Sequence, residues 1–267
     1  MLSSVLGRRI WERRSGYVWW LAGLVALASI TVGFWPTIER DTDALGQLFE
    51  SLPKGFVSIF GASDVEALFT AAGFINSRIY SSVGAIIVVF FAISMGTHAI
   101  AGEEDSRTLD LLLSHPIARR SIVIQSFGAM AAMTAGLALA VLIVLLVADP
   151  LVDLDLPLEG MVAANVGMVL LALVFGTLAL AVGGATGRRA LTMGIAAGAT
   201  FATFFVNGLA PLIEQIAWTR RLTPFFWVLD PQPLEQGFAW QFLVLAVVIV
   251  ALLGAAVWSF DRRDVAV

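Results

Sequence analysis

Residues 160–213 read GMVAANVGMVLLALVFGTLALAVGGATG, then RR, then ALTMGIAAGATFATFFVNGLAPLI, and this stretch decides the fold. Arg188 and Arg189 are its only charged residues. The two uncharged windows, 160–187 and 190–213, are together too long for one membrane crossing, which needs about 20 apolar residues. An arginine at the centre of a membrane helix costs about 2.5–3.5 kcal/mol. The arginine pair therefore predicts a tight turn at a membrane surface between two spans.

The rest of the chain holds four more windows of this kind. All six lack Asp, Glu, Lys and Arg, and they are 15–38, 79–102, 121–148, 160–187, 190–213 and 236–260. Backbone groups cannot stay unpaired in hydrocarbon, so windows that are apolar on all sides are expected to be helices. The alternation typical of a membrane β-barrel is missing. We therefore predict an all-α integral membrane protein with six transmembrane helices in one domain over residues 1–267.

The composition supports this class of protein. Of the 267 residues, 59% are hydrophobic and 13% charged, whereas soluble domains carry about 25% charged residues. A soluble enzyme and a disordered protein are therefore excluded. The net charge of -4 does not indicate the basic surface that binding to nucleic acid requires. The chain has no cysteine, which excludes disulfides and thiol chemistry.

The placement of basic residues predicts the orientation. With the N-terminus in the cytoplasm, eleven of the 16 Lys and Arg residues fall on the inner side and five on the outer side. The outer loop 149–159 has four acids and no base. Basic residues concentrate in cytoplasmic loops. We therefore expect a plasma membrane protein with both termini on the cytoplasmic side. The preference for arginine over lysine suggests a prokaryotic source.

Two outer segments are longer than simple turns. Residues 39–78 contain apolar residues at helical spacing, which fits either amphipathic pieces lying on the outer membrane surface or a folded cap on the spans. Residues 214–235 are rich in aromatics and prolines, among them Pro224, Phe225, Phe226 and Trp227. Such aromatics are typical of a membrane–water interface, and the prolines prevent one continuous helix.

One cytoplasmic segment, EEDSRTLDLLLSHPIARR at residues 103–120, has the pattern of a short amphipathic helix. Its acidic start, with Glu103 and Glu104, suits a helix N-terminus. Leu109, Leu112 and Leu113 then share one face, and Pro116 ends the helix. An apolar stripe exposed to the cytoplasm needs a cover, either from the protein's own spans or from a partner.

Motifs for catalysis are missing from the sequence. The phosphate-binding loop is absent, and Lys54, the only lysine, lies in an outer loop. Neither His98 nor His115 has the spacing of a zinc site, and a G-x-S-x-G motif is absent. The spans carry no charged residue, unlike most proton- or sodium-coupled carriers. We therefore predict no catalytic, cofactor-binding or metal-binding residue in this chain.

Small residues recur four apart in several spans. Ala172 with Gly176, and Ala179 with Gly183, are examples from the fourth window. Such spacing lets helix backbones approach closely. The pattern fits packing within one chain, and it also fits a subunit interface or a moving seam.

Residues 103–120 resemble the cytoplasmic motif of ABC-2 type transporter permeases, in which an acidic start leads to Thr-Leu, an acidic residue, Leu-Leu, Ser, Pro and basic residues. The resemblance extends to the six spans and to a Thr-Pro-Phe motif in the last outer loop, here residues 223–225 followed by Phe226, with Gly237 before span six. Residues 52–53, 60–61 and 73–74 look like the first outer loop of the subgroup with compact six-span subunits.

This resemblance implies a permease that works as a dimer, with a second copy or a homologue, together with two separate ATPase subunits. The segment 103–120 would be the coupling helix seated in the ATPase. The residues that carry over are Glu103, Glu104, Thr108, Leu109, Leu112, Leu113 and Pro116. ATP would be bound by the partner, and this chain would hold no cofactor. Residues 214–235 would form a re-entrant helical pair at the outer face.

The leading hypothesis is therefore the membrane subunit of an ATP-driven exporter. The alternative is a membrane anchor or assembly factor that transports nothing and needs no ATPase. An intramembrane enzyme would lack a nucleophile and base. The sequence leaves the substrate open among lipids, peptides, drugs and metal-related factors.

Overall fold

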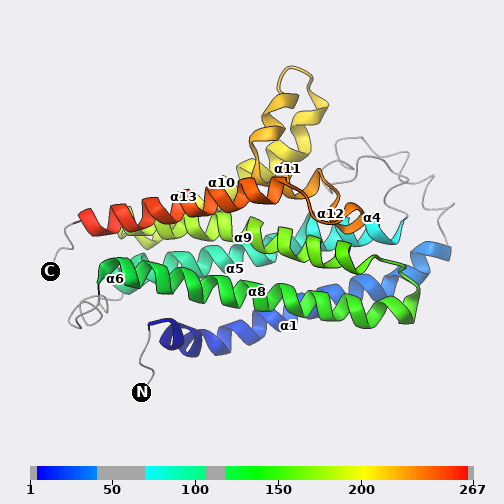
Figure 1. The fold of residues 1–267 in the computed structure, drawn as a ribbon, viewed down its shortest axis with the longest axis horizontal. Helices are drawn as coiled ribbons and strands as arrows, with labels where there is room; N and C mark the ends of the chain where they lie inside the picture. The colour runs from blue at the N-terminus through cyan, green and yellow to red at the C-terminus, as the bar shows by residue number, and fades with distance from the viewer. Residues whose placement is uncertain (1–4, 41–69, 106–117, 264–267) are drawn as a thin grey trace.

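The computed structural model describes residues 5–40, 70–105 and 118–263, although side chains are described for only part of residues 5–12. These residues form helices and connecting turns, with no strand among them. Six helical stretches are long and apolar enough to cross a membrane. Figure 1 shows the long helices lying side by side along one axis. The predicted all-α membrane fold with six spans is confirmed.

The spans follow the chain in order. They comprise α1 (Val5–Arg40), the stretch Ala71–Asp105, α8 (Arg119–Val152), α9 (Leu158–Thr186), α10 (Arg189–Leu209) and α13 (Gln241–Arg262). Four short helices link α10 to α13: η4 (Ala210–Leu212), η5 (Ala217–Leu222), α11 (Pro224–Leu229) and α12 (Pro233–Gln236). The predicted turn at the arginine pair follows Gly187, whose positive φ of 65° ends α9.

The second span is built from five segments. They are α4 (Ala71–Ile75), η2 (Asn76–Tyr80), α5 (Val83–Thr97), η3 (His98–Gly102) and α6 (Glu103–Asp105), of which η2 and η3 are π-helical turns. Helix begins at Ala71, well before the predicted window, because Thr70 caps it by accepting a 3.0 Å hydrogen bond from the Gly73 amide. Arg78, which set the start of the predicted window at residue 79, is exposed and lies over the Phe74 ring.

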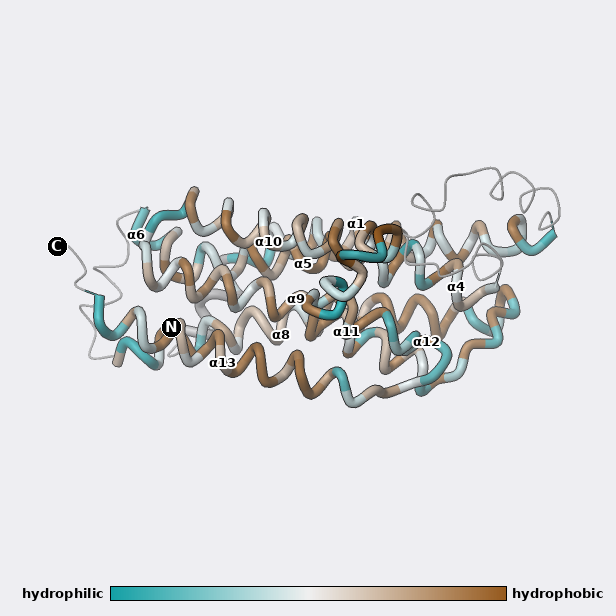
Figure 2. Tube along the Cα trace, turned by 90° about the horizontal axis from the view of Figure 1, so that it is seen from above, coloured by the Kyte–Doolittle hydropathy of each residue, from teal (hydrophilic) through white to brown (hydrophobic). Residues whose placement is uncertain are grey.

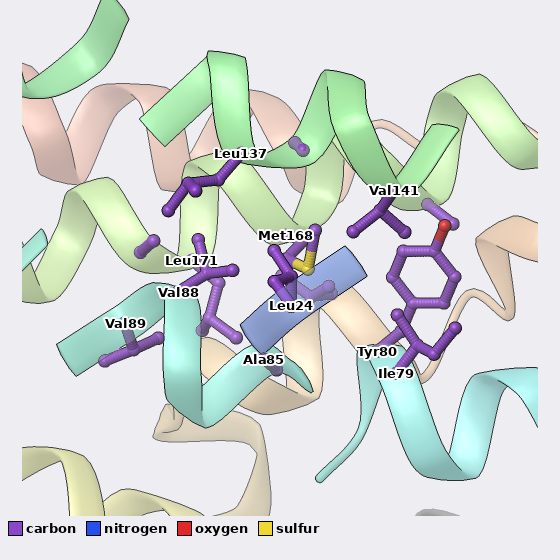
Figure 3. Close-up of a cluster of buried hydrophobic side chains, with 14 of the residues drawn as sticks. Leu24, Ile79, Tyr80, Ala85, Val88, Val89, Leu137, Val141, Met168 and Leu171 are labelled. Carbon is purple, nitrogen blue, oxygen red and sulfur yellow. The ribbon is translucent and has the colours of Figure 1, made fainter. Parts of the chain in front are cut away.

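The second and fourth spans form the centre of the bundle. Their most apolar stretches are 67% buried, whereas the other four spans are 22% to 39% buried. Figure 3 shows Leu24 of α1, Val88 of α5, Leu137 of α8 and Leu171 of α9 gathered in one apolar cluster. A long-range polar bond also joins two side chains in this part of the core: the Asn165 side-chain amide donates to the Tyr80 hydroxyl at 2.8 Å.

Two glycines bring the central spans together. A Cβ atom on Gly96 of α5 would overlap the Gly176 carbonyl oxygen of α9. A Cβ atom on Gly176 would lie 2.7 Å from the Met130 sulfur and 2.9 Å from the Ala92 Cβ. Small residues at such crossings let helix backbones touch. This fixes α5 and α9 as a close pair.

The polar residues mark the two ends of the bundle. Figure 2 shows hydrophobic colour along the middle of the long helices and hydrophilic colour at the ends and in the segment between α10 and α13. Figure 1 places the start of α1 and the end of α13 at one end, together with α6. We call this the terminal end; the α9–α10 turn lies there too, since α9 ends and α10 begins at it.

Gly96→Ala should destabilise the protein, because its added methyl group has no space against the α9 backbone. Overpacking of this kind costs about 1–3 kcal/mol. Thermal unfolding of the detergent-solubilised protein should show a lower midpoint temperature.

Gly254→Ala is the matched control, since a Cβ atom at Gly254 of α13 meets nothing within 4 Å. Its unfolding temperature should equal or exceed that of the parent protein. Equal midpoints for all three proteins would show that the glycine crossing does not hold α5 and α9 together.

Candidate functional site

The terminal end carries both ends of the segment predicted to couple to a partner. Glu103 and Glu104 lie in α6 and are half-buried. The other predicted coupling residues lie outside the described residues; they are Thr108, Leu109, Leu112, Leu113 and Pro116. The chain is described again from residue 118, just before α8 begins at Arg119. The structure therefore describes the two stems of the segment.

The π turn η3 sets the position of the first stem. Gly102 is packed against His98, because an added Cβ atom would lie 2.6 Å from the His98 Nδ1. The His98 Nε2 lies 3.1 Å from the Arg189 Nη2. Since Arg189 is the first residue of α10, this contact joins the C-terminal part of the second span to the fifth span.

An ion pair joins the first stem to the last span. The Arg263 Nη2, just after α13, donates a hydrogen bond to the Glu104 Oε1. The two side chains are only 20% and 25% exposed. A Cβ atom on Gly187 would overlap both side chains. The absence of a side chain at the α9–α10 turn thus makes room for the ion pair.

Arg119 joins the second stem to the same place. Its Nη1 donates hydrogen bonds to the Arg263 carbonyl oxygen at 2.7 Å and the Phe260 carbonyl oxygen at 3.3 Å. Carbonyl groups in the last turn of a helix have no partner within the helix, and a positive charge there is favourable. The Arg119 guanidinium also lies 5.8 Å from the centre of the buried Phe260 ring.

These contacts define the terminal cluster: Glu104, Arg119, Gly187, Phe260 and Arg263. Phe260 belongs to a small apolar core with Ile100, Val123, Leu180 and Ala256 from three other spans and its own. Both stems of the 103–120 segment therefore meet at the end of α13, beside the α9–α10 turn. Nothing in the sequence pattern paired these residues, although a glycine after an apolar helix is an ordinary signal for its end.

The second predicted site lies before the last span. Figure 1 shows the chain between α10 and α11 projecting from the side of the bundle. Of the four predicted residues of α11, Phe225 is fully buried, with ring centres 5.9 Å from Phe175 and 5.5 Å from Phe204. Pro224, Phe226 and Trp227 are half-buried. Phe225 thus anchors α11 in the bundle.

A polar cluster holds the projecting segment at its base. Thr223 caps α11 by accepting a 3.2 Å hydrogen bond from the Phe226 amide. The Oδ1 of buried Asn207 accepts a hydrogen bond from the Arg220 Nε at 3.3 Å. The Arg220 Nη2 lies 3.4 Å from the Asp230 Oδ1. Asn207 lies within the uncharged window 190–213, and nothing in the sequence pattern pointed to this cluster.

The chain was compared with known proteins. The model of the family described as ABC-2 family transporter protein matches residues 13–265. The chain belongs to this family. No curated protein matches the sequence. Family membership makes the chain a multi-pass membrane component of an ABC transporter, a transport component that is not itself catalytic, and it confirms the resemblance drawn from residues 103–120.

Among the residues that the structure describes, no group of three or more His, Asp or Glu side chains could hold a metal ion. The polar contacts of the ABC-2 chain instead join helices to one another.

Thr223→Val should loosen the base of the projecting segment, because valine keeps the shape of threonine but cannot cap α11. Loss of a helix cap costs about 1 kcal/mol. Limited proteolysis should cut residues 213–222 faster, whereas Thr223→Ser, which keeps the hydroxyl group, should be cut at the parental rate. Equal rates for the parent and Thr223→Val would contradict this role.

Proposed function

We propose that this chain is the permease subunit of an ABC exporter and that a separate ATPase subunit docks on residues 103–120. The observation that carries the proposal is the position of this segment. Its two stems leave the bundle together at the terminal end, in a chain that belongs to the ABC-2 family. The direction of transport follows the resemblance to compact six-span export permeases.

The charge distribution supports a cytoplasmic position for the terminal end. Ten of the 16 basic residues belong to described segments at this end, including Arg119, Arg188, Arg189 and Arg263. Basic residues in short loops stay on the cytoplasmic side. Both termini and the 103–120 segment then face the compartment that holds ATP, in the plasma membrane of a prokaryote.

The leucine stripe of the segment supports a protein partner. Leu109, Leu112 and Leu113 share one helical face in the sequence pattern. The chain lacks the phosphate-binding loop of ATPases, so the energy must come from a partner that binds ATP. The stripe is the surface through which that partner would act, with Glu103, Glu104, Thr108 and Pro116 beside it.

The projecting segment supports a dimer of permeases. This segment and the adjoining end of α10 expose large apolar side chains, among them Phe205 of α10, Leu212 of η4, and Trp218 and Leu222 of η5. Its short 3₁₀ turns satisfy their backbone groups less fully than a long helix does, and such backbone is not found facing lipid. A second permease copy or a homologue would cover this surface. In the assembled transporter, residues 214–235 with Pro224, Phe226 and Trp227 would form the re-entrant outer element.

Leu112→Asp should leave membrane insertion intact and remove the ATPase subunit. The reason is that a carboxylate on the stripe opposes burial against a partner. The measurement is the yield of the ATPase subunit that copurifies with the tagged permease in mild detergent.

Leu48→Asp is the control, since the same substitution falls in the predicted outer loop. It should keep the ATPase subunit at the parental ratio. A parent protein that copurifies with no nucleotide-binding subunit would favour a membrane anchor instead, and Leu112→Asp with full ATPase binding would move the docking site elsewhere.

Phe205→Cys should form a disulfide-linked dimer in oxidised membranes. The chain has no cysteine of its own, so any crosslink comes from the introduced residue. Leu139→Cys is the control, because Leu139 is similarly exposed, at 54% against 48%, but lies on α8. A dimer band for Leu139→Cys and none for Phe205→Cys would place the subunit contact on another face.

A further inference from the structure

We propose that the terminal cluster makes α13 the span that moves with the docking segment. Glu104 and Arg119 fix the two stems of residues 103–120 to the last turn of α13. A displacement of the segment would therefore pull the end of this span. The inference rests on the proposed docking of an ATPase subunit at residues 103–120, and it adds the route by which that docking reaches the membrane.

The ion pair is partly shielded from solvent, since its two side chains are 20% and 25% exposed. The Glu104 Oε2 and the Arg263 Nη1 are both buried, with no hydrogen-bond partner among the described residues. Each of these charged groups therefore depends on the other. Separating this partly buried pair would leave both charges uncompensated, which is unfavourable. When Glu104 moves, the favourable response is for Arg263 to follow.

Arg119 joins the second stem to the same end of α13. It binds the carbonyl oxygens of Phe260 and Arg263, while Glu104 binds the side chain of Arg263. The two stems thus hold the same turn through different atoms. A pull on the segment reaches α13 through either stem, and a sliding of one stem past the helix end would break bonds of the other.

Among the spans that meet at the terminal cluster, α13 has the smallest buried share. The central pair α5 and α9 is locked by the crossing of Gly96 and Gly176. In contrast, α13 exposes one whole face, with Leu243, Val247 and Val250 exposed at 67% to 70%. A helix with one bare apolar face can shift in lipid without exposing new polar groups. Of the spans joined at the terminal cluster, α13 is the peripheral one.

Gly187 lies directly beside the ion pair of Glu104 and Arg263. It ends the central helix α9, and its missing side chain makes room for both charged groups. The ion pair therefore lies against the most buried part of the bundle. The segment and α13 would move together past this turn.

The test uses the complex of the permease with its copurifying ATPase subunit, in the cysteine-free chain. Ala255→Cys, on the exposed side of α13, carries an environment-sensitive fluorophore, and Leu139→Cys on α8 carries it in a second sample. Fluorescence is recorded before and after trapping with ATP and vanadate. We expect a spectral shift at residue 255 in the parent complex.

Arg263→Gln breaks the ion pair and should abolish the shift at residue 255, while the amount of bound ATPase subunit stays the same. Arg263→Lys, which keeps the charge, should retain the shift. Arg262→Gln is the matched control: it removes one positive charge one residue away, where Arg262 lies over Trp258 outside the cluster. It should behave like the parent.

Arg119→Gln gives a second, independent break and should reduce the shift without changing the signal at residue 139. A shift at residue 255 that persists in both Arg263→Gln and Arg119→Gln would overturn the inference, as would a parent complex that binds the ATPase but shows no shift there. A parent protein that binds no ATPase subunit would overturn the proposed function itself. A thermal unfolding curve for each variant separates a lost connection from a lost fold. A variant that unfolds at the parental temperature but shows no fluorescence shift has lost only the connection.

Discussion

The exclusion of charge and of unpaired backbone from hydrocarbon governs this structure. It makes each uncharged stretch a helix, and it moves the charged side chains to the helix ends. The arginines that end the spans then have few partners within reach. At the terminal end, Arg119, Arg189 and Arg263 contact a carbonyl oxygen, a histidine or a glutamate from another span. The same constraint that separates the spans in sequence therefore joins them in space.

The number of spans and their approximate position could be predicted from the sequence, because charge marks a membrane boundary residue by residue. The contacts at those boundaries could not be predicted. Arg188 and Arg189 identified the turn, but the pairing of Glu104 with Arg263 spans 159 residues and depends on how six helices pack. The start of the second span was also missed, since exposed Arg78 ended the uncharged window although its helix begins at Ala71. Phe225, grouped in sequence with interfacial aromatics, lies in the core because α11 turns it toward α9.

The arrangement divides the bundle into a fixed part and a peripheral part. The second and fourth spans are central and share a glycine crossing, whereas α10 and α13 keep broad exposed faces. A transporter needs both, since a pathway opens only when some helices move against others that stay. The described ends of residues 103–120 connect to each part, through η3 to the central second span and through the terminal cluster to α13.

The central claim is that residues 103–120 receive the ATPase subunit of an ABC-2 exporter. Site-specific photocrosslinking tests it most directly, with a photoreactive amino acid at position 109 in living cells and mass spectrometry of the crosslinked product. We predict a crosslink to a nucleotide-binding subunit that is lost when the same amino acid stands at position 48. Crosslinks from position 109 that reach only this chain or lipid would contradict this claim. Capture of the nucleotide-binding subunit from position 48 instead of position 109 would also contradict it.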